Sequence, residues 1–171
     1  FGADLYAGPA AYVRTTYFDQ RASDLIQSVM ISDVSGAITG FQYQNVGAIR
    51  NRGFELEAGF RHRRLSLDAQ FNATSSRVEQ LARNYSGSLR VGDQLPEIPS
   101  SSGSLRLSYG LPKLQFGAGV HYQGSWTGYD WNMIGLASAG ANGIPATQPL
   151  LRRYPGLVMP YLHLSADLLD E

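Results

Sequence analysis

Two neighbouring stretches of the sequence alternate between apolar and polar residues with a period of two. The first covers residues 54–60 and the second covers residues 65–73. Successive side chains of a β-strand point to opposite faces, so this period predicts two strands, and the short polar turn at residues 61–64 joins them in a hairpin. The apolar positions are Phe54, Leu56, Ala58, Phe60, Leu65, Leu67, Ala69, Phe71 and Ala73.

This alternation fits two environments. A soluble β-sandwich buries its apolar face against a second sheet. A transmembrane β-barrel turns the apolar face to lipid and the polar face to its lumen. The rest of the chain has to decide between them.

Further strands and their connections favour the barrel. Strands are predicted at residues 1–6, 11–23, 104–109, 114–123 and 161–168, with longer loops at 27–40, 78–98 and 132–149. Short turns near Gly8, His62 and Leu111 therefore alternate with long loops, which is typical of a strand meander that crosses a membrane. We expect the short turns to be periplasmic and the long loops to face the outside.

Composition supports the same fold and excludes several functions. Charged residues make up 16% of the chain, against about 25% in typical soluble domains. The net charge of zero gives no indication of nucleic-acid binding, and the absence of cysteine excludes disulfides and thiolate metal sites. No catalytic motif such as G-x-S-x-G or H-E-x-x-H is present, so we predict neither an enzyme nor a bound cofactor.

Three segments, in order, resemble a known family. Residues 43–57, which include Asn45-Val46-Gly47 and Gly53-Phe54-Glu55-Leu56-Glu57, are similar to the N-x-G-x-x-x-x-x-G-x-E-x-E strand of TonB-dependent outer-membrane receptors. Tyr17-Phe18-Asp19-Gln20-Arg21 with Asp24-Leu25-Ile26 resembles the family's preceding strand. Leu95-Pro96-Glu97-Ile98-Pro99, ahead of residues 105–109, resembles the segment that follows it.

The resemblance implies a fold and a function. The chain is expected to be an all-β, antiparallel up-and-down transmembrane barrel fragment, with about seven strands of a larger barrel of about 22. Residues 1–171 would form part of the barrel domain, and the plug domain and final strands would lie outside the chain. The implied role is energised uptake of a scarce bulky ligand, most often a ferric siderophore, across the outer membrane of a Gram-negative bacterium. The implied partners are outer-membrane lipid, the receptor's own plug, the inner-membrane TonB complex and a small metal chelate.

Candidate ligand-binding residues lie in the predicted outer loops. Arginine and aromatic side chains there suit an anionic, ring-bearing ligand. The three aromatic residues at 126–131 also fit an interfacial aromatic girdle, which needs no ligand. The candidates are Arg83, Tyr85, Arg90, Trp126, Tyr129, Trp131, Arg152 and Arg153.

A second group of polar residues is expected to face the barrel lumen and the plug. The alternative is that any lumen-facing strand must be polar, whatever it contacts. Two of the group are histidines that could lie near each other, but ordinary lumen polarity explains them better than a metal pair does, so no metal site is predicted. The residues are Glu55, Glu57, Asp68, Gln70, His121 and His163.

Two other functions remain open at this point. The chain could belong to a passive porin or another outer-membrane barrel, in which no plug blocks the lumen. It could also be a soluble β-sandwich binding module, which would fold in water without detergent.

Overall fold

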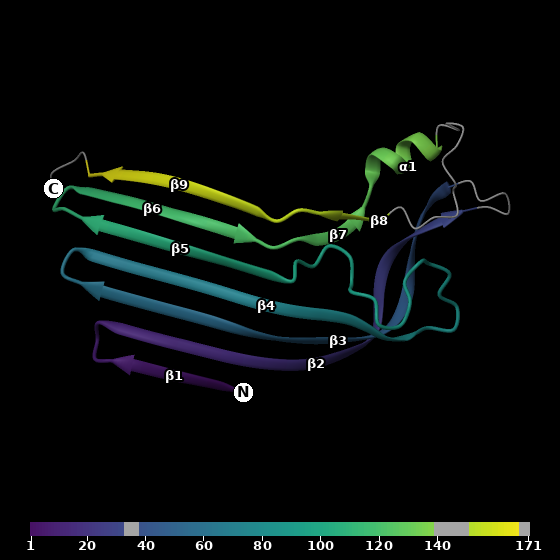
Figure 1. Cartoon of the computed structure of the whole chain (residues 1–171), viewed down its shortest axis with the longest axis horizontal. Helices are drawn as coiled ribbons and strands as arrows, with labels where there is room; N and C mark the ends of the chain where they lie inside the picture. The colour runs from purple at the N-terminus through teal and green to yellow at the C-terminus, as the bar shows by residue number, and fades with distance from the viewer. Residues whose placement is uncertain (33–37, 139–150, 168–171) are drawn as a thin grey trace.

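A computed structural model describes residues 1–32, 38–138 and 151–167. Its main feature is an antiparallel sheet of seven strands that pair in chain order, with the last strand next to the sixth because the two short strands between them form a separate ribbon (Figure 1). The predicted all-β, up-and-down meander is therefore confirmed. The strands, in sheet order, are β1 (Gly2–Ala7), β2 (Ala11–Ser32), β3 (Ile38–His62), β4 (Leu65–Leu81), β5 (Ser101–Gly110), β6 (Leu114–Gln123) and β9 (Leu157–Ala166).

The pairing register keeps the predicted apolar face intact across the sheet. Phe54 pairs with Ala73, and Leu56 pairs with Phe71. Further along the sheet, Leu105 pairs with Ala69 on one side and with Val120 on the other. Residues paired across an antiparallel ladder point to the same face, so one face is apolar from β1 to β9. This apolar band consists of Leu5, Val13, Tyr17, Phe54, Leu56, Ala58, Phe60, Leu65, Leu67, Ala69, Phe71, Leu105, Leu107, Tyr109, Phe116, Ala118, Val120, Val158, Leu162 and Leu164.

The opposite face combines polar side chains with aromatic rings that lie over glycines. A Cβ atom on Gly117 would run into the ring of His163, and one on Gly59 would run into the ring of Tyr12. The missing side chain gives each ring a place on the sheet, a known role of glycine in strands. The other such pairs are Phe18 over Gly53 and Tyr161 over Gly119.

The strands at the loop end are longer than predicted, and the predicted loop at residues 27–40 is wrong. β2 continues to Ser32 and β3 already begins at Ile38, with Met30 paired to Phe41. β4 likewise continues to Leu81, into the connection predicted at residues 78–98. The hydrophobic alternation stops before these strands do, because their outer ends lie beyond the apolar band.

The predicted loop at residues 132–149 also needs correction. It begins with a helix, α1 (Trp131–Ser138), and the flanking segments β7 (Trp126–Tyr129) and β8 (Leu151–Tyr154) pair as a separate two-stranded ribbon. Residues 139–150 lie outside the described part of the chain. No helix in the described ranges is both long and apolar enough to cross a membrane.

The two ends of the sheet differ, as predicted. The turns after β1, β3 and β5 are short and lie together at one end (Figure 1). The long connections, α1 and the β7–β8 ribbon lie at the other end (Figure 1), which we call the loop end.

The buried core is small and lies near the loop end. The connection between β4 and β5 folds back there, so that the Leu95 N–H donates to the Ser76 carbonyl oxygen at 3.0 Å. Leu95 itself is only 1% exposed. The core cluster is Val46, Ile49, Val78, Leu89 and Leu95. Most large apolar side chains of the band are instead exposed, which suits a surface that lipid covers.

Candidate functional site

Three aromatic rings from distant parts of the sequence meet at the loop end. Phe41 comes from β3, Tyr129 from β7 and Trp131 from the start of α1. The Phe41 ring lies 5.6 Å from the Tyr129 ring, edge to face, and 5.2 Å from the Trp131 ring. The Tyr129 and Trp131 rings are 6.0 Å apart. These distances fall in the range of attractive ring contacts.

A pocket opens beside these rings. It has a volume of about 140 Å³, close to the roughly 150 Å³ of a cavity that holds one benzene molecule. Its walls combine apolar and aromatic side chains with about as much polar surface, and Glu97 contributes the single charged side chain among the described residues that line it. We call it the aromatic pocket; it is lined by Gln27, Ser28, Val29, Phe41, Tyr85, Leu89, Pro96, Glu97, Tyr129 and Trp131.

Two phenols of the aromatic pocket are held in their neutral form. Burial raises the pKa of Tyr85 and of Tyr129, because it penalises the phenolate. The Tyr85 hydroxyl accepts a hydrogen bond from the Leu89 N–H at 3.1 Å, which fixes the ring against its own loop. A phenol is protonated at neutral pH even without this shift, so both hydroxyls can donate hydrogen bonds to a ligand.

A second cluster lies on the β7–β8 ribbon. The rings of Trp126 and Tyr154 stack at 4.5 Å. Arg152 lies over the Tyr154 ring at 5.9 Å and is 3.6 Å from Asp130. The Tyr154 hydroxyl donates to the Tyr129 carbonyl oxygen at 2.8 Å within the ribbon, and the ribbon contributes Tyr129 to the aromatic pocket.

The structure separates the predicted ligand-binding residues into three groups. Tyr85, Tyr129 and Trp131 come together in the aromatic pocket. Trp126, Arg152 and Arg153 belong to the ribbon, where Arg153 donates to Ser125 Oγ at 2.8 Å. Arg83 and Arg90 are exposed on the β4–β5 connection and do not line the pocket.

Sequence reasoning missed Phe41 and Tyr154. Phe41 directly follows the predicted loop at residues 27–40 and lies outside the alternating stretches, so its place on a strand facing Tyr129 was not visible. Tyr154 could have been found from its neighbours, because an aromatic residue directly after two arginines matches the composition of the other candidates.

The residues predicted to face the lumen all lie on the polar face of the sheet. Glu55, Glu57, Gln70 and His121 line one open hollow of about 540 Å³. Asp68 and His163 lie on the same face, closer to the short turns. Whether this face contacts a plug stays a prediction.

The two histidines of this face have separate neighbours. The His121 ring stacks on Tyr161 at 5.1 Å, and the His163 ring lies over Gly117. Within the described residues, no group of three or more histidine, cysteine, aspartate or glutamate side chains could hold a metal ion.

The motif residues noted in the sequence are in contact with one another. Gly47 has φ +119°, at an irregular pairing of β3 with β2 and β4, and a Cβ atom there would overlap the Gln80 carbonyl oxygen. Asn45 Nδ2 donates to Asp24 Oδ1 at 2.9 Å, and Arg50 binds Asp19 through two hydrogen bonds of 2.7 Å. Two of the segments that carry the resemblance are thus the paired strands β2 and β3.

The open antiparallel meander, its outward apolar band and the contacts between β2 and β3 agree with a comparison to known families. The family described as TonB dependent receptor-like, β-barrel, matches residues 1–154. The chain belongs to this family. TonB-dependent receptor barrels are outer-membrane proteins that transport ligands and do so with TonB.

Curated relatives of this TonB-dependent receptor chain come from Haemophilus influenzae. An uncharacterised TonB-dependent receptor of strain Rd is 36% identical over 95 residues, which cover 52% of this chain and 27% of the relative. The Heme/hemopexin utilization protein C of strain 86-028NP is 30% identical over 117 residues, or 64% of this chain and 15% of the relative. The chain thus spans about a quarter or less of these relatives.

Solved structures with the same fold support the barrel assignment. The siderophore receptor PiuA from Acinetobacter baumannii superimposes with a TM-score of 0.63 at 17% identity, over 99% of this chain and 22% of that structure. The copper transporter OprC gives a TM-score of 0.63 at 15% identity, over 98% of this chain and 22% of that structure. The FrpB iron transporter from Neisseria meningitidis gives a TM-score of 0.58 at 18% identity, over 98% of this chain and 24% of that structure. The predicted membrane barrel fold is confirmed.

Proposed function

We propose that this chain forms part of the barrel of an outer-membrane receptor for energised uptake of a scarce, bulky ligand, most often a ferric siderophore. The seven-stranded sheet would be one portion of a larger, plugged barrel of about 22 strands. Its polar face, with Glu55, Glu57, Asp68, Gln70, His121 and His163, would contact the receptor's own plug, which TonB moves. The barrel would span the outer membrane of a Gram-negative bacterium, with the loop end outside.

The aromatic pocket is the observation that supports ligand binding by this portion. Its volume of about 140 Å³ fits a single aromatic ring and is too small for a whole chelate. The ligand would therefore place one aryl group in the pocket and rest its remainder on the loops. Neutral hydroxyls of Tyr85 and Tyr129 would donate hydrogen bonds to that group.

The negative charge of the ligand would be bound by residues outside the aromatic pocket. No arginine lines the aromatic pocket among the described residues. Arg152 and Arg153 lie next to it on the ribbon and are exposed. A metal chelate with both an aryl ring and negative charge would use the pocket and the ribbon together.

The proposal is tested with the complete receptor in an outer-membrane preparation. Binding and uptake of ferric catecholate and ferric hydroxamate siderophores, haem and cobalamin are compared for the unchanged protein and for Trp131→Ala. We expect aryl-bearing ligands to bind about tenfold more weakly to the variant, since a stacked ring contributes about 1 kcal/mol or more.

The control removes an aromatic residue away from the pocket. Tyr109→Ala changes the apolar band near a short turn and leaves the loop end untouched. Equal loss of binding in both variants would contradict the pocket. Rapid passive entry of sugars into liposomes carrying the native protein would instead indicate a porin.

A further inference from the structure

The outward face of β2, β3 and β4 changes character abruptly at the loop end of the apolar band. Tyr17 pairs with Phe54, which is the last apolar pair of the band on these strands. The next pair on the same face is Asp19 with Arg52. No bulge interrupts the register between these positions, so the charged side chains point outward like the apolar ones.

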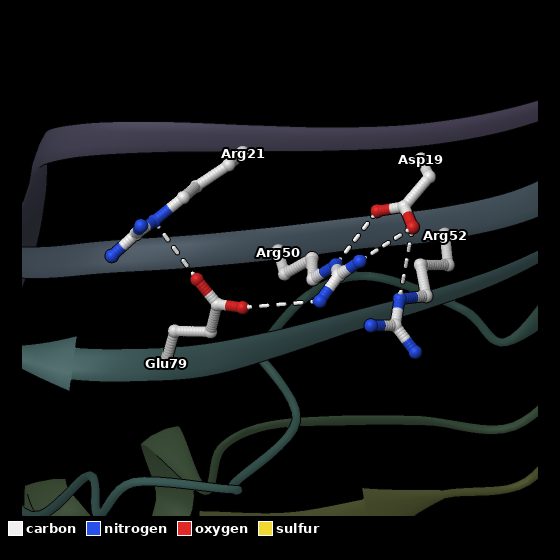
Figure 2. A network of polar contacts seen from close by, with 5 residues as sticks. All are labelled: Asp19, Arg21, Arg50, Arg52 and Glu79. Atoms are coloured by element: carbon white, nitrogen blue, oxygen red, sulfur yellow. Dashed lines mark hydrogen bonds and ion pairs between the residues drawn. The ribbon is translucent and has the colours of Figure 1, made fainter.

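Five charged side chains form one network on this outward face (Figure 2). Arg50 binds both carboxylate oxygens of Asp19 at 2.7 Å, and Arg52 approaches the same carboxylate at 3.3 Å. Glu79 joins a third arginine to the group, because it lies 2.9 Å from Arg21 and 3.5 Å from Arg50.

A further arginine extends the network into a groove. Arg77 pairs with Arg50 in the ladder, and its Nη1 donates to the Gly92 carbonyl oxygen at 2.7 Å. Within the described residues, no carboxylate lies within ion-pair distance of Arg77. Arg50, Arg52, Arg77 and Glu79, with residues 75, 78, 91 and 92, line a groove of about 350 Å³.

This group has an excess of positive charge that its own contacts leave uncompensated. We define the outer arginine cluster as Arg21, Arg50, Arg52 and Arg77 with Asp19 and Glu79; four positive and two negative groups leave a charge of +2. Arg21 is 61% exposed and Arg52 is 50% exposed, so both can reach a ligand. The ion pairs among Asp19, Arg50 and Glu79 contribute to stability as a network, but they leave the exposed guanidinium groups of Arg21 and Arg52 available to a ligand.

The height of the cluster on the barrel places it at the head-group layer. With a rise of about 3.3 Å per residue and a strand tilt of about 40°, Asp19 lies roughly 5 Å beyond Tyr17 along the membrane normal, and Arg21 roughly 10 Å beyond it. The polar layer on each side of a bilayer is about 5–8 Å thick. Asp19 and Arg52 thus lie within this layer, and Arg21, Arg50 and Arg77 lie at or just beyond its outer edge, all facing outward rather than into the lumen.

We propose that the outer arginine cluster binds a phosphate group of a phosphorylated lipid in the outer leaflet. Arginine is suited to phosphate because its planar guanidinium offers two parallel N–H donors to two oxygens. Asp19 and Glu79 hold Arg50 in place, while Arg52 and Arg77 flank the groove. This inference rests on the proposed function only for the outside position of the loop end. It does not depend on which ligand passes through the lumen.

The test measures lipid retention by the complete receptor. The protein is purified in detergent, and bound bisphosphorylated lipid A is titrated by native mass spectrometry. The double variant Arg52→Gln with Arg77→Gln is compared with the unchanged protein. We expect about tenfold or greater weakening in the variant, because it removes two guanidinium groups that flank the groove and would bind the phosphate.

The matched control removes the same charge at the opposite end of the barrel. Arg61→Gln with Arg64→Gln lies at the short turn between β3 and β4, and we expect it to bind lipid A like the unchanged protein. Equal binding by both double variants would overturn the proposal. Heat-dependent gel mobility of each variant checks that its barrel is folded, and Arg52→Lys with Arg77→Lys should bind with intermediate strength if the geometry of the guanidinium matters.

Two further titrations identify the source of the phosphate. Dephosphorylated lipid A should bind the unchanged protein no better than it binds the glutamine variant, and millimolar inorganic phosphate should not displace lipid A. Displacement by inorganic phosphate, or equal binding of the dephosphorylated lipid, would overturn a lipid-phosphate site. Siderophore uptake is measured in parallel, so that a failure of the proposed transport function is seen separately.

Discussion

At the scale of single residues, the family motif has a direct physical cause. Gly47 holds a positive φ that side-chain-bearing residues rarely adopt, and backbone atoms of β4 and its connection fill the space of its missing Cβ. Asp24, at φ +57°, accepts the hydrogen bond from Asn45 across the same irregular pairing. These residues re-aim the long ends of β2 and β3 toward the aromatic pocket, as bulges do in other sheets.

Replacing Gly47 with alanine should destabilise the barrel. The strained φ alone costs about 1–3 kcal/mol, and the clash with the Gln80 carbonyl oxygen adds to it. The measurement is the thermal unfolding midpoint of the reconstituted receptor. Gly110→Ala is the control, because its Cβ would lie 4.0 Å from the nearest oxygen. Equal midpoints for the two variants would contradict the role assigned to Gly47.

The tyrosines of the aromatic pocket predict a dependence on alkaline pH. Burial raises the folded-state pKa of Tyr85 and Tyr129 above the usual value near 10. A raised pKa means that the folded state holds the proton more tightly, so this contribution to stability is complete below pH about 10. It is lost as the pH rises through the folded-state pKa.

A spectroscopic titration of phenolate absorbance checks this expectation. Tyr85→Phe and Tyr129→Phe should each remove a component that titrates above the bulk of the tyrosines. Tyr43→Phe is the control, since Tyr43 is 79% exposed. If Tyr85→Phe and Tyr129→Phe removed the same titrating component as Tyr43→Phe, the result would show that the pocket does not bury its phenols.

At the scale of elements, the strands could be predicted from the sequence within the apolar band but not beyond its loop end. Most strands were predicted where one face meets lipid, because the alternation is regular only there. The outer halves of β2 and β3 are paired yet carry polar or mixed side chains on both faces, so residues 27–40 were read as a loop. The register of the hairpin at residues 54–73 was correct because its turn is short and its apolar face continuous.

Helix α1 could not be found from periodicity for a different reason. It is a helix of eight residues, WNMIGLAS, and contains a glycine. Isolated helices of this length are unstable, so its formation depends on tertiary contacts. Ile134 is 6% exposed and supplies such a contact. The capping side chain Asp130 was the available local signal, because its Oδ1 accepts the Met133 N–H at 3.2 Å.

Removing that cap should loosen α1 and the ribbon together. Asp130→Ala loses the bond to Met133 and the ion pair with Arg152, and the cap alone contributes about 0.5–2 kcal/mol. Hydrogen exchange of the amides at residues 131–138 should become faster in the reconstituted receptor. Asp130→Asn retains a capping oxygen and should stay close to the unchanged protein; equally fast exchange in both variants would contradict capping by this side chain.

At the scale of the whole molecule, the two faces of one sheet account for both the membrane and the proposed ligand path. The apolar band on β4 extends over residues 65–73, which corresponds to a height of roughly 20 Å at the usual rise and tilt. Charged side chains on that face begin beyond its loop end, in the outer arginine cluster. Selectivity would lie above it, in loops that bring together residues with no local sequence pattern.

The facing of the sheet can be tested with two adjacent residues of β5. Leu105 lies at the middle of the apolar band, paired with Ala69 and Val120, whereas Ser104 points to the polar face, paired with Gln70 and His121. Leu105→Arg should cost about 2–4 kcal/mol because it places a charge near the bilayer midplane. Ser104→Arg should cost much less, since it enters the open polar hollow next to Glu57. Unfolding of both variants in lipid vesicles by denaturant gives the two free energies, and equal costs would mean that the sheet does not separate lipid from lumen.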